Sequence, residues 1–219
     1  MAEQKEFYRR HLPHWQPPEA TYHITFRLKG SLPGEVIERL RAEREEAEKM
    51  LLKNDIDNEE KNRTLLEFHW MHFEKFDAML DTHPCGPHWL DGSAVASIVD
   101  EALHYRDGKE YDLIAHCIMP NHVHMVFSLL AKVSRNDIPT YDKPLFRIMQ
   151  SLKRYTASKS NLSLGRSGAF WQDESYDHVV RDADELDRTI RYVLNNPVKA
   201  GLVESWEKWK WTYLKPGLL

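Results

Sequence analysis

Residues 111–130 read YDLIAHCIMPNHVHMVFSLL. The runs 111–119 and 122–130 are rich in β-branched, aromatic and other apolar residues, which favours strands, and the Pro120-Asn121 pair between them is typical of a turn. We therefore expect an antiparallel hairpin. In its second strand His122 and His124 are two residues apart, so both imidazoles project from one face while Val123 points to the other.

The elements predicted around this hairpin define a fold class. Residues 21–29, TYHITFRLK, alternate as a strand does, and residues 176–180, YDHVV, form a second short strand. Helices are expected from Glu35 to about Leu80 with a break near residues 54–58, from a cap at Ser93 to about Tyr105, over 143–160, and from Asp182 to Pro197. This order predicts an α+β fold of the ferredoxin-like kind, with a central antiparallel sheet flanked by helices. We expect one domain over residues 1–219, with a helical insertion near residues 35–105.

Composition restricts the class of protein. The chain has 219 residues and only two cysteines, Cys85 and Cys117, so a disulfide framework is excluded and a reducing, cytoplasmic location is expected. No apolar run reaches the roughly 18 residues that a membrane span needs. The first fifteen residues also lack the apolar segment of a signal peptide.

Charge is distributed unevenly along the chain. Residues 35–81 contain fourteen acidic and eight basic residues, whereas residues 143–166 contain six basic residues and no acidic one. Binding of phosphate responds to the local field rather than to the net charge of −4. We therefore predict DNA phosphate contacts at Lys153, Arg154 and Arg166, although a basic stretch can also be only a solvated face.

Two pairs of residues suggest chemistry. His122 and His124 can chelate one divalent metal, although such a pair is equally typical of hydrogen-bonded polar residues. Tyr192 and Asn196 are four residues apart on the last predicted helix and so share one face. There the phenol oxygen can approach a metal that the amide oxygen also contacts, and the alternative is that Tyr192 only packs in the core.

The combination of a metal and a tyrosine fits DNA strand transfer. A metal polarises a phosphodiester, and a phenolate can attack phosphorus to form a covalent phosphotyrosine link. Such an enzyme needs a single strand, which aromatic and basic residues hold, and Trp171 follows the basic helix. Tyr155 is a competing nucleophile on that helix, but its partner four residues on is Lys159, which cannot bind a metal while charged.

Three motifs carry a resemblance. The segment MPNHVHMVF resembles the HUH motif of single-strand DNA transposases. The segments GRSGAFWQDESYDHVVRD and RYVLNNPVKAGLV, together with the opening HLPHWQPPEATYHITFRLKGSLP, resemble the REP-associated tyrosine transposases. The resemblance covers nearly the whole chain, and residues 35–81 are its least recognisable part.

The resemblance implies a role for each matching residue. His122 and His124 correspond to the metal ligands, Asn196 to the polar side chain that completes the site, and Tyr192 to the nucleophile, with Mg²⁺ or Mn²⁺ as the metal. It implies an HUH endonuclease fold and a single-stranded DNA substrate with a palindromic hairpin, hence a nucleoid-associated protein. A homodimer with shared active sites is compatible with it. Two other functions stay open, a hairpin-binding protein that no longer cuts and a metal-dependent hydrolytic nuclease.

Other histidines are also candidates for a functional role. His178 follows Asp177 near the expected site and is predicted to contact DNA, or else to be a structural histidine. His116, on the strand beside the histidine pair, is predicted either to support the metal ligands or to pack in the sheet. His83, Cys85 and His88 are too few, and too interrupted by Pro and Gly, to predict a zinc site.

Overall fold

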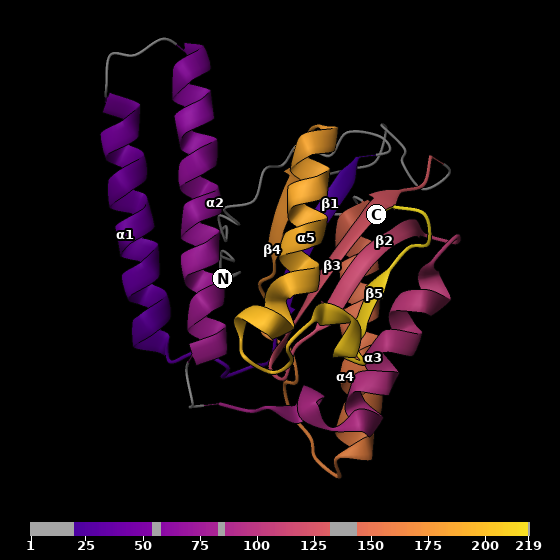
Figure 1. Ribbon diagram of the computed structural model, residues 1–219. Coiled ribbons are helices and arrows are strands. Elements are labelled where there is room, and N and C mark those ends of the chain that lie inside the picture. The colour runs from indigo at the N-terminus through magenta and orange to yellow at the C-terminus, as the bar shows by residue number, and fades with distance from the viewer. Residues whose placement is uncertain (1–19, 54–57, 83–85, 132–143, 219) are drawn as a thin grey trace, which may run out of the picture.

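A computed structural model describes residues 20–53, 58–82, 86–131 and 144–218. Its sheet has five strands in the order β4-β1-β3-β2-β5, and each neighbouring pair is antiparallel. The strands are β1 (Thr21–Arg27), β2 (Tyr111–Ile118), β3 (His122–Leu129), β4 (Tyr176–Val180) and β5 (Thr212–Leu214). The predicted α+β fold with a central antiparallel sheet is confirmed, and the hairpin β2–β3 lies within it (Figure 1).

Helices cover both faces of the sheet. Helices α3 (Ser93–Arg106) and α4 (Pro144–Ser163) pack on one face, and α5 (Ala183–Lys199) packs on the other (Figure 1). The alternation along β3 explains this division. Val123, Met125 and Phe127 belong to the core under α3 and α4, whereas Val126 belongs to a second core with Val193 of α5. His122 and His124 alternate with Val123 and Met125, and so they share the α5 face.

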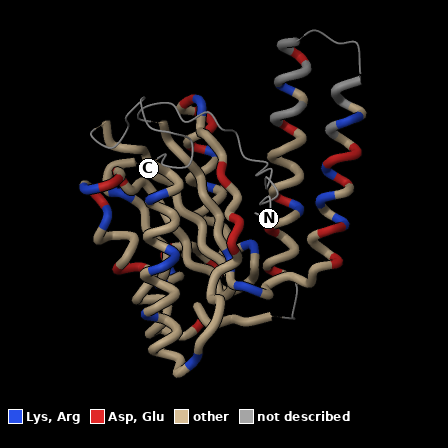
Figure 2. The backbone as a smooth tube through the Cα atoms, turned by 180° about the vertical axis from the view of Figure 1, so that it is seen from behind, with Lys and Arg blue, Asp and Glu red and all other residues tan. Residues whose placement is uncertain are grey.

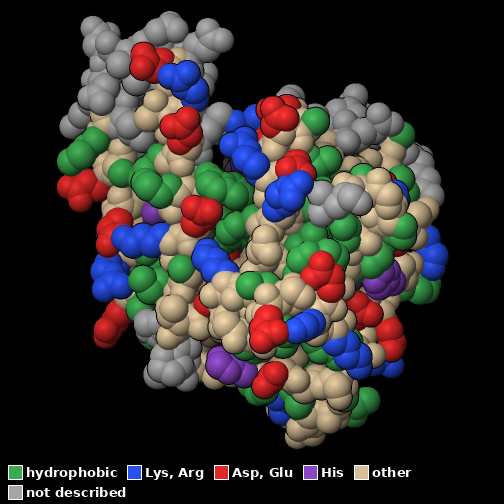
Figure 3. Space-filling model, in the orientation of Figure 1, with side chains coloured by type: hydrophobic (Ala, Val, Ile, Leu, Met, Phe, Trp, Pro, Cys, Tyr) green, Lys and Arg blue, Asp and Glu red, His purple; other side chains and the backbone are tan. Residues whose placement is uncertain are grey.

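The charged segment forms a helical hairpin beside the sheet. Helices α1 (Gly34–Lys53) and α2 (Asn58–Thr82) lie side by side (Figure 1), and both acidic and basic residues occur along each of them (Figure 2). On the face of the hairpin that Figure 3 shows, acidic and basic side chains are mixed where the residues are described. The half of the hairpin nearest the sheet is apolar inside, because Leu40, Phe73 and Leu80 are each only 1% exposed. Because its inner face is buried, this segment packs as part of the folded domain. Because its charges are mixed, it does not form a uniformly acidic surface.

Some boundaries differ from the sequence-based predictions. Gly92, not Ser93, occupies the cap position of α3, and Ser93 is the first helical residue. Helix α5 does not end at Pro197 but continues for two more residues to Lys199, although a proline at this position removes one intrahelical hydrogen bond. Asp182 caps α5 as predicted, accepting a hydrogen bond of 2.8 Å from the Glu185 amide. Strand β5 was not predicted, because three residues are too short for an alternating pattern.

Two single-turn helices lie between the longer elements. The single-turn helices η1 (Trp89–Asp91) and η3 (Trp206–Lys208) precede α3 and β5 respectively. Residues 11–19, the first part of the opening segment that carries the family resemblance, lie outside the described residues, as do His83 and Cys85. None of the described helices is long and apolar enough to cross a membrane.

Candidate active site

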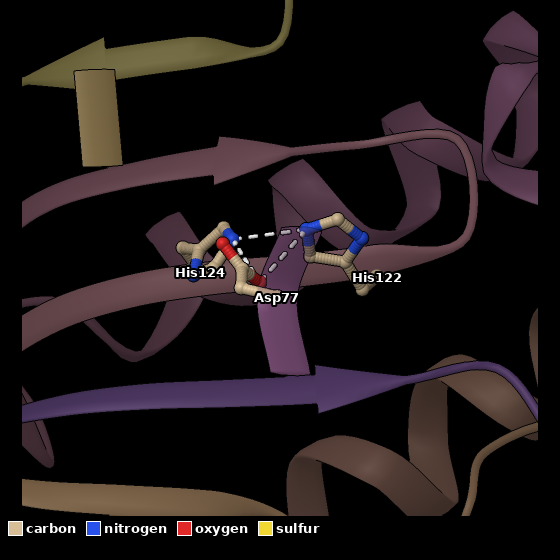
Figure 4. Close-up of side chains that lie close together, drawn as sticks. All are labelled: Asp77, His122 and His124. Atoms are coloured by element: carbon tan, nitrogen blue, oxygen red, sulfur yellow. Dashed lines mark hydrogen bonds and ion pairs between the residues drawn. The ribbon is translucent and has the colours of Figure 1, made fainter. Parts of the chain in front are cut away.

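The two histidines of β3 converge as the H-x-H spacing predicts. Their Nε2 atoms are 2.9 Å apart, and both side chains are 0% exposed (Figure 4). Nδ1 of His122 is 2.6 Å from Oδ1 of Asn121, whose amide nitrogen donates to the Leu80 carbonyl at 2.8 Å. Because that amide oxygen can only accept, Nδ1 of His122 carries the proton and Nε2 presents a lone pair. Asn121 thus sets the tautomer that a metal ligand needs.

The other imidazole has its own support from β1. Nδ1 of His124 is 2.8 Å from Oγ1 of Thr25 and 3.3 Å from Nε2 of His23. Thr25 is paired with His124 across the sheet, so the contact follows from the strand register. These contacts occupy Nδ1 and leave Nε2 of His124 facing His122.

A third ligand group comes from the helical hairpin. Oδ1 of Asp77, on α2, is 3.3 Å from Nε2 of His124 and 3.6 Å from Nε2 of His122 (Figure 4). The three residues form a group that can hold a metal ion, and all three are buried. Sequence reasoning missed Asp77, because it is one of fourteen acidic residues in a segment with no recognisable motif. Its aromatic neighbours in the sequence were the one available signal that this part of α2 is buried.

Tyr192 meets this group from α5, and Asn196 lies one helical turn further along the same helix. The phenol of Tyr192 donates a short hydrogen bond to Oδ2 of Asp77, and its ring centroid is 6.0 Å from that of His124. Asn196 is 0% exposed and donates from Nδ2 to the Tyr192 carbonyl at 3.1 Å. Its side-chain oxygen has no hydrogen-bond partner in the part of the chain that the structure describes. A buried, unsatisfied oxygen one helical turn from Tyr192 is available as a further ligand.

Aromatic rings wall this group of side chains. Phe73 of α2 stacks on Tyr176 with centroids 4.1 Å apart and meets His23 edge-on at 5.2 Å. Trp70, one turn earlier, approaches the Tyr192 ring to 5.4 Å. The site is therefore surrounded by apolar surface, where electrostatic interactions are stronger than in water.

Burial and neighbouring charges shift the pKa of three side chains in the site, those of His122, Asp77 and Tyr192. It lowers the pKa of His122 to about 3, with a further contribution from His124, so this ligand is neutral at physiological pH. Burial opposes ionisation of Asp77, but the neighbouring His124 and His122 outweigh it and hold the pKa of that carboxyl below its usual range. Burial and the charge of Asp77 together raise the pKa of Tyr192 well above its ordinary value. Asp77 is thus a carboxylate, and the phenol stays protonated beside it.

The donor set fits a divalent metal. Separations of 2.9, 3.3 and 3.6 Å between the three donor atoms match ligands about 2.1 Å from one centre, and a lone pair of His122 already points there. Two imidazoles with a carboxylate and an amide oxygen suit Mn²⁺ at least as well as Mg²⁺, which prefers oxygen alone.

The chain is similar in sequence to a curated protein. A curated protein of Haemophilus influenzae, named REP-associated tyrosine transposase, is 28% identical to the chain over 110 residues, which make up 47% of this chain and 58% of that protein. The chain thus resembles the REP-associated tyrosine transposases, as its motifs predict. It spans less than two thirds of that relative's length.

One solved structure is similar to this chain over most of its length. A REP-associated tyrosine transposase solved with a bound REP hairpin superposes with a TM-score of 0.48 at 14% identity, covering 97% of this chain and 82% of that one. No family model matches the chain.

The residues predicted to contact DNA are spread over the molecule. His178, on β4, is paired with His23, and its Nε2 is 2.8 Å from Glu185. Arg154 is exposed on α4, which covers the opposite face of the sheet from the histidine pair. Lys153 donates to the carbonyls of Gln172, Asp173 and Glu174 at 2.9, 3.1 and 3.5 Å.

The other two predicted DNA contacts have partners within the protein. The guanidinium of Arg166 lies 3.8 Å from the centroid of the Trp89 ring and also bonds to Asn161. Trp171 is only 5% exposed, and its indole donates to Thr156 at 2.9 Å. A role for Arg166 and Trp171 in DNA binding stays a prediction, and their observed contacts are structural.

Tyr155 and His116, which the sequence offered as further candidates, lie on the face of the sheet opposite to His122. Tyr155, the competing nucleophile, is 48% exposed on α4 and lies on the face of the sheet away from His122. His116 points to that same face, since it pairs with Met125, whose side chain belongs to the core under α3 and α4. His88 is exposed.

Proposed function

We propose that this protein is a metal-dependent enzyme that nicks and rejoins single-stranded DNA through a covalent bond to Tyr192. The observation that carries the proposal is the convergence of His122, His124 and Asp77 on one point, with the Tyr192 hydroxyl bonded to the same carboxylate. A divalent cation and a phenol nucleophile at one site are what phosphoryl transfer to a tyrosine needs.

The ligands proposed are Nε2 of His122 and His124, Oδ1 of Asp77 and the free side-chain oxygen of Asn196. The cation, Mg²⁺ or Mn²⁺, would neutralise charge that builds on the phosphate oxygens during transfer. It would also offset the negative charge of Asp77, which contributes to the raised pKa of the nearby phenol.

Tyr192 then performs the covalent step. Its phenol oxygen attacks phosphorus, the bond from phosphorus to the 3′ oxygen breaks, and that oxygen leaves with a proton as a free 3′ hydroxyl. The phenol proton is released in the same exchange, so protons balance. The 5′ phosphate stays on Tyr192 and conserves the bond energy, and the reverse attack by a 3′ hydroxyl rejoins the strand without ATP.

The class of substrate follows from the transposase resemblance. The curated relative is named for association with REP sequences, which are palindromic. We propose single-stranded DNA with a hairpin and a single-stranded flank as the substrate. We propose that exposed basic side chains on α4, such as that of Arg154, contact the phosphates of this DNA.

One experiment tests the chemistry. The purified protein is mixed with labelled hairpin oligonucleotides of varied sequence and Mn²⁺ or Mg²⁺, and the products are separated on a denaturing gel. We expect a slow-migrating adduct that EDTA, Tyr192→Phe and His122→Ala each abolish. Tyr155→Phe is the matched control and should keep it, because that phenol lies on the other face of the sheet.

Other outcomes separate the remaining functions. Cleavage without an adduct, retained in Tyr192→Phe, indicates a hydrolytic nuclease. Binding of hairpins without any cleavage indicates a DNA-binding protein that has lost the chemistry. An adduct lost in Tyr155→Phe alone would move the nucleophile to α4.

A further inference from the structure

We propose that Asp100, His104 and His116 form a second metal site, separate from the candidate active site, which takes a late first-row dication such as Zn²⁺. Nε2 of His116 is 3.2 Å from Oδ1 of Asp100 and 3.4 Å from Nε2 of His104, and the His104 and Asp100 atoms are 3.8 Å apart. Each residue thus directs one donor atom toward a common point.

The cluster lies on the face of the sheet opposite to the first site. His116 pairs with Met125 of β3, whose side chain belongs to the core under α3 and α4, while His124 belongs to the α5 face. Asp100 and His104 are four residues apart on α3 and so share the side of that helix turned to β2. The sheet itself separates the two sites, and neither residue set contributes to the other.

The separations match tetrahedral coordination. Zinc holds nitrogen and carboxylate oxygen at roughly 2.0–2.1 Å, which places two tetrahedral ligands about 3.3 Å from each other. The observed 3.2–3.8 Å lies around this value without any rearrangement of the backbone. Two imidazoles and one carboxylate select Zn²⁺, Co²⁺ or Ni²⁺ rather than Mg²⁺, which prefers oxygen.

The side chains around the cluster leave a fourth coordination position open to water. His116 is 1% exposed, whereas the side chains of His104 and Asp100 are 36% and 33% exposed, so water can reach the cluster from one side. The Tyr213 ring of β5 closes another side, stacking on His116 at 5.5 Å and meeting His104 edge-on at 4.6 Å. Three protein ligands and an open fourth position match a zinc site that retains a water molecule.

Such a metal would connect three elements. It would join α3 to β2 directly, and it would order Tyr213 on the short edge strand β5, which pairs with β2 alone over three residues. Because the ligands come from separate elements, the metal would bind the folded chain and not the unfolded one, and so raise thermal stability.

The test uses chelator-treated protein and two readouts, the stoichiometry of Zn²⁺ binding by calorimetry and the visible spectrum of bound Co²⁺. The first site also offers two histidines and a carboxylate, so we expect two equivalents of Zn²⁺ in the wild type and one in His104→Ala. Asp100→Asn should weaken the second site at least tenfold. His88→Gln replaces an exposed histidine outside the cluster and is the matched control.

A second arm removes the first site. In the double variant His122→Ala/His124→Ala we expect one equivalent of Zn²⁺, a tetrahedral Co²⁺ spectrum and a rise in Tm on adding Zn²⁺, all lost on adding His104→Ala. Equal Zn²⁺ stoichiometry and affinity in the wild type and His104→Ala would overturn the proposal. That result would leave Asp100, His104 and His116 as a hydrogen-bonded network only.

Discussion

The Tyr192 hydroxyl donates its hydrogen bond to one oxygen of Asp77, while the other oxygen of that carboxylate faces His122 and His124. One side chain from the helical hairpin therefore connects the nucleophile proposed on α5 with the metal ligands proposed on β3. The residues it joins are far apart in sequence, 115 positions in the case of Tyr192. We expect the charge on this carboxylate to affect both the proposed metal binding and, together with burial, the ionisation of the phenol.

Asp77→Asn should separate these two effects. Removing the charge should weaken Mn²⁺ binding at least tenfold, because one anionic ligand becomes neutral. It should also lower the pKa of Tyr192, since the carboxylate is one cause of its elevation after burial. Calorimetric titration with Mn²⁺ measures the first effect, and ultraviolet titration of the phenol in EDTA, compared with Tyr192→Phe, measures the second.

Glu67→Gln is the control, because Glu67 is an exposed acid on the same helix. It should leave both quantities unchanged. If Asp77→Asn bound Mn²⁺ as tightly as the wild type, Asp77 would not be a ligand, and the site would consist of the histidines and Asn196 alone.

The side chains of the candidate site are closed off from solvent, partly by α2. Asp77, His122 and His124 are all 0% exposed, and Phe73 stacks on Tyr176 beside them. We propose that a phosphodiester reaches the site when this part of α2 is displaced. We expect amide hydrogen exchange in residues 70–82 to become faster when hairpin DNA and Mn²⁺ are bound to Tyr192→Phe, which traps the complex before the covalent step.

Exchange in α3 serves as the internal reference, since α3 packs on the other face of the sheet. Unchanged or slower exchange in residues 70–82 would mean that DNA approaches without displacing α2. In that case the helical hairpin would be a fixed wall of the substrate site.

The sequence predicted the parts of the site that lie in regular patterns. The H-x-H pair and the Tyr192–Asn196 spacing are set by strand and helix periods, so their shared faces could be read from residue numbers. Asp77 and the Asn121–His122 contact depend instead on how α2 packs against the β2–β3 turn, which is tertiary and has no sequence period. The buried state of Trp171 was missed for the same reason, because its partner Thr156 lies on a different element.

Trp171 and Arg154 should behave differently when each is replaced. Trp171 is buried against Phe26, with ring centroids 4.8 Å apart, so Trp171→Ala should cost about 3–5 kcal/mol in the free energy of unfolding. Arg154 is exposed, so Arg154→Ala should leave stability unchanged and lower the salt dependence of DNA binding by roughly 0.7–0.9 in the log–log slope. Denaturant unfolding and binding measured at several salt concentrations check these values.

Lys208→Ala is the matched control for Arg154→Ala, since Lys208 is an exposed cation paired with Glu204 near the C-terminus. If the salt dependence of DNA affinity were the same in the wild type, Arg154→Ala and Lys208→Ala, Arg154 would not contact the phosphates of the DNA.

Asp81 should make the metal-free protein less stable as the pH rises. Burial, followed by the charge of Asp77, raises the pKa of its carboxyl to about 7, against about 3.9 in an unfolded chain. The folded state therefore favours the protonated form, so the stability present below about pH 4 is lost progressively up to about pH 7. In EDTA, Asp81→Asn should raise Tm by a few degrees at pH 8 and have little effect at pH 4.

Thermal unfolding at both pH values, with Asp173→Asn as the exposed-carboxylate control, checks the sign. A variant that is less stable than the wild type at pH 8 would show that the ionised Asp81 makes favourable contacts in the fold.

The proposed metal ligands and the proposed nucleophile Tyr192 lie together in one chain. We therefore expect that two subunits do not share an active site. The Tyr192 ring is 6.0 Å from the ring of His124 in the same chain, so a monomer in this conformation needs no partner's nucleophile. A mixture of His122→Ala and Tyr192→Phe proteins should therefore stay inactive in the adduct assay, even when both are present in excess. Recovery of the adduct in the mixture would show that Tyr192 of one chain serves the metal site of another, and size-exclusion chromatography would then show a dimer. The single variants, each mixed with an equal amount of wild type, are the controls, because they should retain the activity contributed by the wild-type chains.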